Sequence, residues 1–394
     1  MLTRAARRAV SPAACRLHAA TSQWGSRSVA GFWTRANDAT RPQSSGIHGS
    51  LGRTPLTTMA ASAQSSSATT GVVDATQELS KKGAFVRTES QFRDALGSDK
   101  YPVEAGRYHL YVSYACPWAC RCLMVRNLKG LQDAIGVSVV HPVWVQTKPG
   151  VDEHRGWGFG TDFAGADGDP IYGAATVRDL YERLAGGQKV TKFTVPMLVD
   201  TKTDTIVNNE SSEIIRMLTS VCDSISSNPG LDLYPAELRE AIDAVNAWVY
   251  PKLNNGVYRS GFATTQEAYD EAVAEVFEAL DDMEEILSKQ RWLAGDGKRF
   301  TEADLRAFVT IVRFDAVYVT HFKCNRKTIR EYPNITDFMR EIYQMPGISD
   351  TVDLDHIRHH YQRSHPSINK YGIVAVCPDP LLDAPHDRAR FPQA

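Results

Sequence analysis

Residues 111–121 read YVSYACPWACR, in which an apolar strand runs into a small residue, a cysteine and a proline. A helical pattern follows directly, and proline suits the first turn of a helix because its missing N–H would lack a partner there. The pattern places the Cys116 sulfur at or just before a helix N-terminus, where free N–H groups and the helix dipole favour an anion. Such a cysteine is a candidate thiolate nucleophile. The alternative is a structural cysteine buried in the turn.

The segments that flank this turn predict a strand-helix-strand unit. Residues 107–113 alternate as a strand, and residues 117–131 carry apolar side chains at helical spacing. Residues 137–145 (VSVVHPVWV) form a continuous apolar run, which predicts a strand buried on both faces. A strand, a helix and a second strand in this order favour a βαβ unit with a parallel pair.

The rest of the first half continues this alternation. It predicts a long Gly- and Asp-rich loop, a helix, two strands and a further helix, at residues 148–169, 177–184, 193–199, 205–207 and 209–218. The resulting order β-α-β-α-β-β-α is that of a thioredoxin-like α/β domain.

The second half has helical periodicity. Amphipathic stretches predict helices at residues 236–253, 266–289 and 332–345, and the pattern fades after His356. Thr301 is expected to begin another helix as its N-cap, with Asp304 reaching back. We therefore expect a thioredoxin-like α/β domain followed by an all-α C-terminal domain. The expected boundaries are 1–73 for a disordered transit segment, 74–105 for an entry segment, 106–227 and 235–375 for the two domains, and 376–394 for a tail.

The N-terminal segment differs in composition from the rest of the chain. Residues 1–73 contain eight arginines, no lysine and one acid, Asp38. This composition is typical of an organellar transit peptide, and the alternative is a disordered tail without a targeting role. Arginines spaced among alanines favour the mitochondrion over the plastid, and a start at Met59 would give a cytoplasmic product. No apolar run predicts a membrane span, and the acidic remainder disfavours nucleic-acid binding.

The seven cysteines have neither the spacing of a disulfide framework nor that of a zinc site. None forms a C-x-x-C pair, so a thioredoxin-type dithiol is unsupported. We expect free thiols, a reducing compartment and no metal.

Two further features are candidates for ligand binding. Pro196 interrupts a predicted strand; a cis peptide bond there would expose the backbone of Val195 to an extended peptide, and a trans proline on an edge strand is the alternative. Glu210 and Ser211 begin a helix, where a carboxylate, a hydroxyl and free N–H groups can bind a zwitterion. An ordinary helix cap is the alternative for this pair.

Together these features resemble the glutathione transferases, and more closely the omega-like Xi class of glutathionyl-hydroquinone reductases. The resemblance covers residues 106 to about 375 and rests on the segments YHLYVSYACPWACR, TVPMLVD, TIVNNESSEIIRM, NNGVYRSGFATTQEAYDEAV, FTEADLRAF, VRFDAVYVTHFKCN, IYQMPGI and DHIRHHYQRSH. It implies a thioredoxin-like domain that binds glutathione as co-substrate without a metal. It also implies a homodimer joined through the helical domain.

The resemblance assigns roles to individual residues. Cys116 would be the nucleophile and Tyr258 the proton donor near an aromatic substrate. Tyr318 and Tyr361 match tyrosines that bond the thiol and lower its pKa. Glutathione would be held by Trp157, by Lys192, Phe193, Thr194 and Val195, and by Glu210 and Ser211.

Two positions depart from the family pattern. Lys192 stands where the family commonly has arginine, so the charge is kept and the planar fork is lost. Cys120 stands one turn beyond Cys116, where the family commonly has histidine. A buried helix cysteine is the expected state of Cys120, and its reaction with an oxidised Cys116 stays open.

The activity that the resemblance implies is glutathione-dependent reduction of glutathionyl-hydroquinones to hydroquinones through a Cys116–glutathione mixed disulfide. A general thiol transferase or dehydroascorbate reductase of the omega type is the alternative enzyme. A non-catalytic binding module with the same fold is the alternative of another class.

Overall fold

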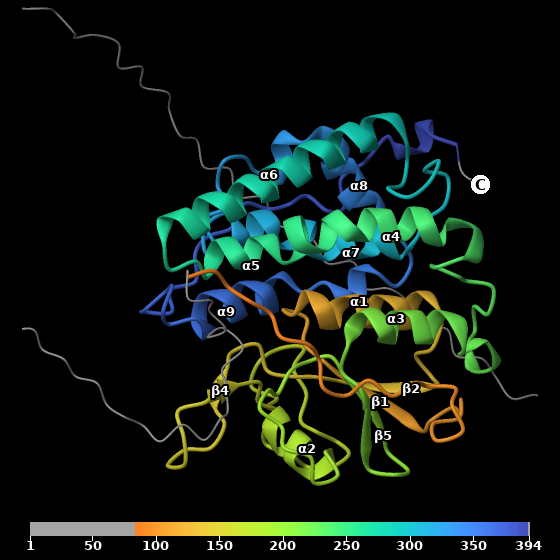
Figure 1. Cartoon of the computed structure of the whole chain (residues 1–394), viewed down its shortest axis with the longest axis vertical. Helices are drawn as coiled ribbons and strands as arrows, with labels where there is room; N and C mark the ends of the chain where they lie inside the picture. Colours follow the sequence, from red (N-terminus) through yellow and green to blue (C-terminus); the bar gives the residue numbers. More distant parts are fainter. Residues whose placement is uncertain (1–82, 393–394) are drawn as a thin grey trace, which may run out of the picture. The chain divides into compact units, whose positions relative to one another are not determined.

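The computed structural model describes residues 83–392 of the chain (Figure 1). The expected transit segment, the start of the entry segment and Met59 lie outside the described residues. Within the described part, no helix has both the length and the apolar character needed to cross a membrane.

A mixed four-stranded sheet forms the centre of the first half. Its strands are β1 (Tyr108–Val112), β2 (Ile135–Val139), β5 (Met197–Asp200) and β6 (Thr205–Asn208), in the order β2-β1-β5-β6. β1 and β2 are parallel, whereas β5 is antiparallel to β1 and β6 is antiparallel to β5. The order of the elements along the chain is the predicted thioredoxin-like one, with the short β3 and β4 added. β1 lies between β2 and β5 in the sheet, and its five residues are all buried.

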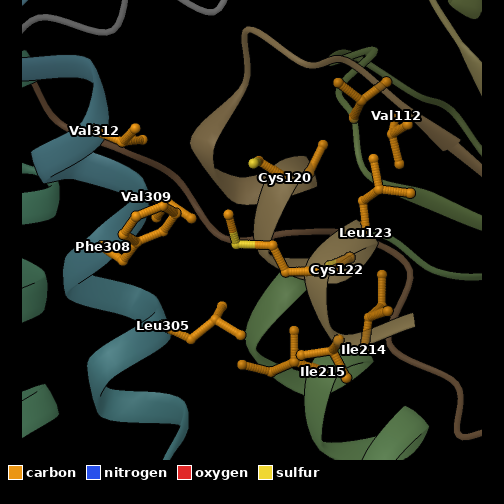
Figure 2. Packing of buried hydrophobic residues seen from close by; sticks show 14 of the residues in the cluster. Val112, Cys120, Cys122, Leu123, Ile214, Ile215, Leu305, Phe308, Val309 and Val312 are labelled. Carbon is orange, nitrogen blue, oxygen red and sulfur yellow. The ribbon is translucent and has the colours of Figure 1, made fainter. Parts of the chain in front are cut away.

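Three helices flank this sheet. α1 (Pro117–Leu128) and α3 (Ser211–Ser220) lie side by side between the sheet and the helical half, and α2 (Val177–Leu184) lies beyond the sheet (Figure 1). Figure 2 shows Cys120 of α1 and Ile215 of α3 on the side toward Leu305 and Val309 of α7 (Glu302–Arg313), and Leu123 and Ile214 on the side away from it. A continuous apolar core therefore joins the α/β half to the helical half.

The predicted strand over residues 137–145 was wrong at its C-terminal end. β2 ends at Val139, and the two-residue strand β3 (Val145–Gln146) pairs instead with β4 (Arg155–Gly156). Proline at position 142 has no N–H to donate to a ladder, and the N–H of His141 bonds the carbonyl of Gly158. The apolar residues Val140 and Trp144 are nevertheless buried, because a loop packed on the core hides them as well as a strand would.

The second half is helical, as predicted. Its described α-helices are α4 (Arg239–Trp248), α5 (Gly256–Gly261), α6 (Gln266–Lys289), α7, α8 (Pro333–Tyr343) and α9 (Leu354–Ser364). The helix expected over residues 236–253 is divided, with a wide π-turn at Val249–Asn254. Pro251 lies inside that turn and cannot donate the regular helical hydrogen bond, which accounts for the widening.

The helical pattern fades after His356 in the sequence, but the helix α9 continues to Ser364. Asp353 caps α9 by accepting a hydrogen bond from the His356 N–H. The buried positions of α9 include His356, Ile357, His360 and Tyr361 at helical spacing. Histidines occupy apolar positions of this helix, so its amphipathic pattern is hard to recognise in the sequence.

The capping box at the start of α7 is present as predicted. One oxygen of the Asp304 carboxylate accepts the Thr301 N–H at 2.9 Å and the Thr301 hydroxyl at 3.0 Å, and the other accepts the Leu293 N–H at 2.7 Å. Asp304 is fully buried. The Asp304 carboxylate therefore accepts hydrogen bonds from two buried backbone N–H groups, those of Thr301 and Leu293, and from the Thr301 hydroxyl.

We expect Asp304→Ala to lower the free energy of unfolding by about 2–4 kcal/mol, because it removes the cap and leaves two buried N–H groups without acceptors. Urea unfolding of the full chain measures this. The matched control is Asp296→Ala, which removes an exposed aspartate paired with Lys298 on the preceding loop. Equal stabilities of the two variants would contradict the role assigned to Asp304.

Candidate active site

Cys116 is the N-cap residue of α1, so the helix begins at Pro117. Its Sγ lies 3.5 Å from the carbonyl oxygen of Val195. The Val195–Pro196 peptide bond is cis. The thiol and the proline loop therefore lie side by side, where the inner strand β1 ends and its neighbour β5 begins.

Opposing effects act on the Cys116 thiol. Burial raises its pKa above the ordinary value for cysteine, and this effect is the largest. The N–H groups of Ala119 and Trp118 and the charges of Arg87 and Arg313 lower the pKa of the same thiol. The helix N-terminus thus favours the thiolate as the sequence predicts, but the effect of burial on the pKa is larger.

A cavity of about 270 Å³ opens beside this turn. Its lining comes from the entry segment (87–91 and 93), the proline loop (191, 192 and 194–196), the start of α3 (209–211), and Trp118, Arg121 and Tyr250. Of the predicted site residues, those in the lining are Lys192, Thr194, Val195, Glu210 and Ser211. The structure therefore brings these five together.

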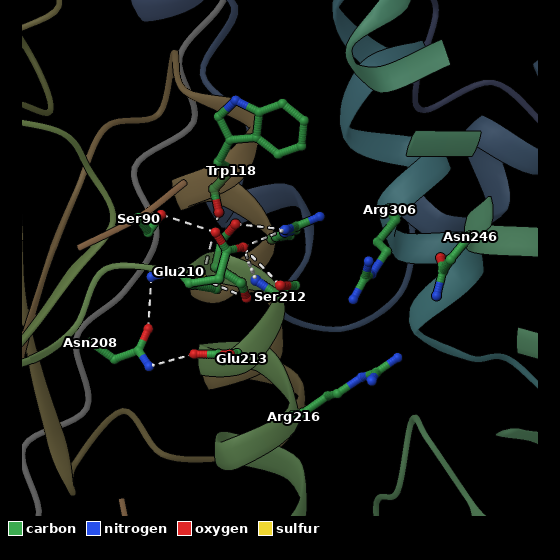
Figure 3. A network of polar contacts seen from close by, with 12 residues as sticks. Ser90, Trp118, Asn208, Glu210, Ser212, Glu213, Arg216, Asn246 and Arg306 are labelled. Carbon is green, nitrogen blue, oxygen red and sulfur yellow. Dashed lines mark hydrogen bonds and ion pairs between the residues drawn. The ribbon is translucent and has the colours of Figure 1, made fainter. Parts of the chain in front are cut away.

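Figure 3 shows the polar contacts at the start of α3. The Glu210 carboxylate accepts hydrogen bonds from the Ser212 N–H at 3.0 Å and from the Ser90 hydroxyl at 3.0 Å. Burial raises the pKa of Glu210, but these donors, the Ser212 hydroxyl and the charge of Arg121 outweigh it and lower the pKa. The carboxylate is therefore ionised at neutral pH and can attract an ammonium group.

Arg121 lies behind this carboxylate and is fully buried. It donates to the Ser211 hydroxyl at 2.6 Å and lies 3.8 Å from Glu210. Its Nε and Nη1 have no hydrogen-bond partner in the described part of the chain, and Arg121 lines the cavity. Buried donors without acceptors next to a cavity are suited to a ligand carboxylate.

A second layer of charged residues connects this corner to the helical half (Figure 3). Glu302, at the start of α7, contacts Arg216 at 2.8 Å, Arg306 at 2.9 Å and Asn246 at 3.1 Å. Burial and the charge of Arg121 lower the pKa of Arg306 to about 10. This layer holds α3, α4 and α7 together beneath the cavity.

Sequence reasoning missed several residues that line the cavity, among them Arg87, Trp118 and Arg121. The Arg87 guanidinium carbon lies 4.7 Å from the Trp118 ring centre and 5.6 Å from that of Tyr258. Trp118 stands two residues after Cys116, so its place beside the thiol could have been inferred from the sequence. Nothing in the sequence marks Arg87, because the course of the entry segment across the cavity depends on tertiary packing.

Two predicted glutathione contacts lie outside the cavity lining. Trp157 is buried, and its ring stacks on His360 with centroids 4.4 Å apart. Phe193 is buried against Tyr181 and His154. The structure does not bring these two side chains to the cavity, and the indole in its wall is that of Trp118.

The three predicted tyrosines form one hydroxyl cluster. The hydroxyl of Tyr361 lies 2.5 Å from that of Tyr258 and 3.1 Å from that of Tyr318. Burial is the largest effect on each, and it raises all three pKa values. Sγ of Cys116 donates to the Val195 carbonyl, and the three tyrosine hydroxyls bond one another.

Cys120 is a buried helix cysteine, as expected. Its side chain is fully buried, and Sγ donates to the carbonyl oxygen of Thr351 at 3.3 Å.

Within the described part of the chain, no group of three or more His, Cys, Asp or Glu side chains is arranged to hold a metal ion.

A group of buried histidines packs behind the tyrosine cluster. His321 Nε2 lies 3.0 Å from His365 Nδ1, and the two rings are stacked. Burial lowers the pKa of His321 to about 4 and that of His360 to about 3, so both are neutral in the folded protein at neutral pH.

These histidines are expected to destabilise the protein in mild acid. A histidine whose folded pKa lies below its unfolded value contributes fully to stability above pH 6.5, and this contribution is lost as the pH falls toward 4. At pH 5 the loss is about 2 kcal/mol for His321. Urea unfolding at pH 7.5 and 5.0 should show a smaller fall for His321→Gln than for the wild type. His386→Gln, at a partly exposed position, is the control, and an identical fall in all three proteins would contradict the assignment.

Comparisons with known proteins agree with this geometry. Two family models match, the glutathione S-transferase N-terminal domain at residues 115–221 and the C-terminal domain at residues 266–341. They confirm the predicted two-part fold.

Two relatives illustrate how much of the chain is covered. The glutathionyl-hydroquinone reductase YqjG of Escherichia coli is 49% identical over 315 residues, which is 78% of this chain and 92% of the relative. Its solved glutathione-bound structure matches with a TM-score of 0.71 at 48% identity, over 76% of this chain and 97% of that one.

The solved Xi glutathione transferase of Phanerochaete chrysosporium matches with a TM-score of 0.73 at 48% identity, over 80% of this chain and 99% of that one. Identity at this level over nearly the whole length of the relatives is decisive for family membership. The chain belongs to the glutathione transferase family, within the omega-like Xi class that includes the glutathionyl-hydroquinone reductases.

Proposed function

We propose that this protein reduces glutathionyl-hydroquinones to hydroquinones with glutathione as the reductant. The observation that carries the proposal is the position of Cys116. Cys116 precedes α1 beside the Val195 carbonyl, next to a cavity lined by charged side chains. The charge of its thiolate raises the pKa of Tyr258. A thiol between a zwitterion site and a phenolic proton donor suits cleavage of a bond between glutathione and an aromatic ring.

Glutathione would occupy the cavity in an extended form. Its γ-glutamyl ammonium would pair with Glu210, and the adjacent carboxylate would accept from Ser211 and Arg121. The backbone of Val195 would pair with the cysteinyl part, and Lys192 would lie near the glycyl carboxylate. This order places the glutathione sulfur at the Cys116 end of the cavity.

The reaction then proceeds in two displacements. The Cys116 thiolate attacks the sulfur of the conjugate, the carbon–sulfur bond breaks, and the ring carbon takes the electron pair and a proton from Tyr258. The hydroquinone leaves, and Cys116 remains joined to glutathione in a mixed disulfide. A second glutathione thiolate attacks the glutathionyl sulfur of that disulfide, which releases glutathione disulfide and regenerates the Cys116 thiolate.

Turnover of glutathionyl-menadiol with glutathione, followed by the release of menadiol, tests this proposal. We expect ping-pong kinetics and one glutathione disulfide formed for each hydroquinone. A small mixed disulfide such as that of glutathione with 2-mercaptoethanol serves as the second substrate. Ready reduction of the mixed disulfide without any hydroquinone release would favour the general thiol transferase and overturn the proposal.

We further propose an organellar location and a homodimer. The basic, acid-poor composition of residues 1–73 supports import into the mitochondrion. Imaging of that segment fused to a fluorescent protein tests the location, and a diffuse cytoplasmic signal would contradict it.

Light scattering of the purified chain tests the homodimer, and the mass of a single chain would contradict it.

A further inference from the structure

Arg313 is a fully buried residue at the end of α7 that contacts the nucleophile turn. Its Nε donates to the carbonyl oxygen of Ala115 at 3.0 Å, and its Nη2 donates to that of Tyr114 at 2.7 Å. Its Nη1 donates to the Val309 carbonyl in its own helix at 2.6 Å. Two of its bonds therefore hold the two residues that immediately precede Cys116.

This guanidinium differs from the other fully buried arginines in its lack of a carboxylate partner. Arg121 lies 3.8 Å from Glu210, and Arg388 lies 3.9 Å from Glu341. No ion pair involves Arg313 within residues 83–392; its partners there are three neutral carbonyls and the Cys120 thiol. Burying a charge without a counter-ion is costly. The buried guanidinium therefore stabilises the anionic form of a neighbouring titratable group.

The titratable groups around Arg313 come from every element packed against it. They are Cys116 and Cys120 of α1, Tyr258 of α5, Tyr318 of the turn after α7, and His360 and Tyr361 of α9. Burial raises the pKa values of Tyr318 and Tyr361 well above the ordinary value, and it lowers that of His360 to about 3. These three groups are therefore neutral at neutral pH.

The two thiols remain as partners for the charge. Sγ of Cys120 donates to the Thr351 carbonyl and also contacts the Arg313 side chain. Sγ of Cys116 lies at the N-terminus of α1, where the helix dipole adds to the positive charge. The charges of Arg87 and Arg313 both favour the thiolate of Cys116.

We propose that Arg313 is a positioning residue for the nucleophile: its two donors fix the turn that carries Cys116, and its unneutralised charge favours the Cys116 thiolate. The helical half of the molecule thereby prepares the nucleophile of the α/β half. The role rests on the proposed function only in that Cys116 is the nucleophile.

The test is the rate at which iodoacetamide alkylates Cys116 as a function of pH, in the full chain without glutathione. Peptide mass spectrometry measures the alkylation of Cys116 separately from that of the other cysteines. For Arg313→Met we expect the midpoint of the profile to rise by about one pH unit, which lowers the rate at pH 7 about tenfold and leaves the limiting rate at high pH unchanged. Arg313→Lys should restore most of the shift, because the charge is retained.

Arg388→Met is the matched control. Arg388 is equally buried and also donates to three carbonyls, those of Leu287, Gln290 and Arg291. Its loss should lower the melting temperature without moving the alkylation profile. An unmoved profile in Arg313→Met, or an equal shift in the control, would overturn the proposal.

This assay needs no quinone substrate, so its outcome is separate from that of the proposed function. A shifted profile in a protein that does not turn over glutathionyl-menadiol would leave the role of Arg313 in place and remove the hydroquinone activity. Turnover of the conjugate with an unmoved profile would do the reverse.

Discussion

Replacement of Cys116 by serine is expected to abolish the release of hydroquinone from glutathionyl-menadiol, with a fall in kcat of at least about a thousandfold. Serine keeps the size of the side chain at the start of α1 but its hydroxyl stays protonated at neutral pH. Neither the attack on sulfur nor the mixed disulfide is then available. The same variant should also lose reduction of a small mixed disulfide, because both reactions use this thiol.

Mass spectrometry provides a direct check of the intermediate. Wild-type protein mixed with one equivalent of conjugate should carry glutathione on Cys116, and Cys116→Ser should carry none. Cys120→Ala is the matched control one helical turn away, and it should retain turnover because Sγ of Cys120 bonds the Thr351 carbonyl. Substantial turnover by Cys116→Ala would show that the nucleophile has been misassigned.

Replacement of Tyr258 by phenylalanine is expected to separate the two activities. For glutathionyl-menadiol we expect kcat to fall by about a hundredfold or more, because the departing ring carbon needs a proton in the transition state. Burial and the negative charge of the Cys116 thiolate both raise the pKa of Tyr258. Its proton is therefore held on oxygen until the substrate carbon accepts it.

Reduction of a mixed disulfide should be nearly unchanged in Tyr258→Phe, since a thiolate leaving group needs no proton from this residue. The matched control is Tyr250→Phe. Tyr250 lines the cavity and its ring packs near Trp118, but its hydroxyl is outside the tyrosine cluster. Equal losses with both substrates in Tyr258→Phe would contradict a role in proton donation.

Local patterns in the sequence predicted the elements that carry the site. Alternating residues before Ala115 and helical spacing after Pro117 predicted β1, the turn and α1. The Thr301–Asp304 capping box predicted the start of α7 correctly, and α6 was predicted at the observed bounds, Gln266–Lys289. These features depend on interactions within a few residues, so a single chain segment contains the information.

The errors occurred where distant contacts replace local rules. The apolar run after Val139 predicted a longer strand, but Pro142 ends the ladder and the loop packs on the core instead. In α9 the histidines occupy buried positions that usually hold aliphatic residues, so the periodicity was not recognised.

The sequence by itself predicted the place of Cys116 just before α1, the two-part fold, and Glu210 and Ser211, which face the cavity. Only the tertiary structure placed Arg87 across the cavity and Arg313 against the carbonyls of Tyr114 and Ala115. The physical reason is the range of the interactions. Capping and periodicity act over one helical turn, whereas the charge that acts on Cys116 comes from residues that are distant in the chain and meet it only when the two halves pack together.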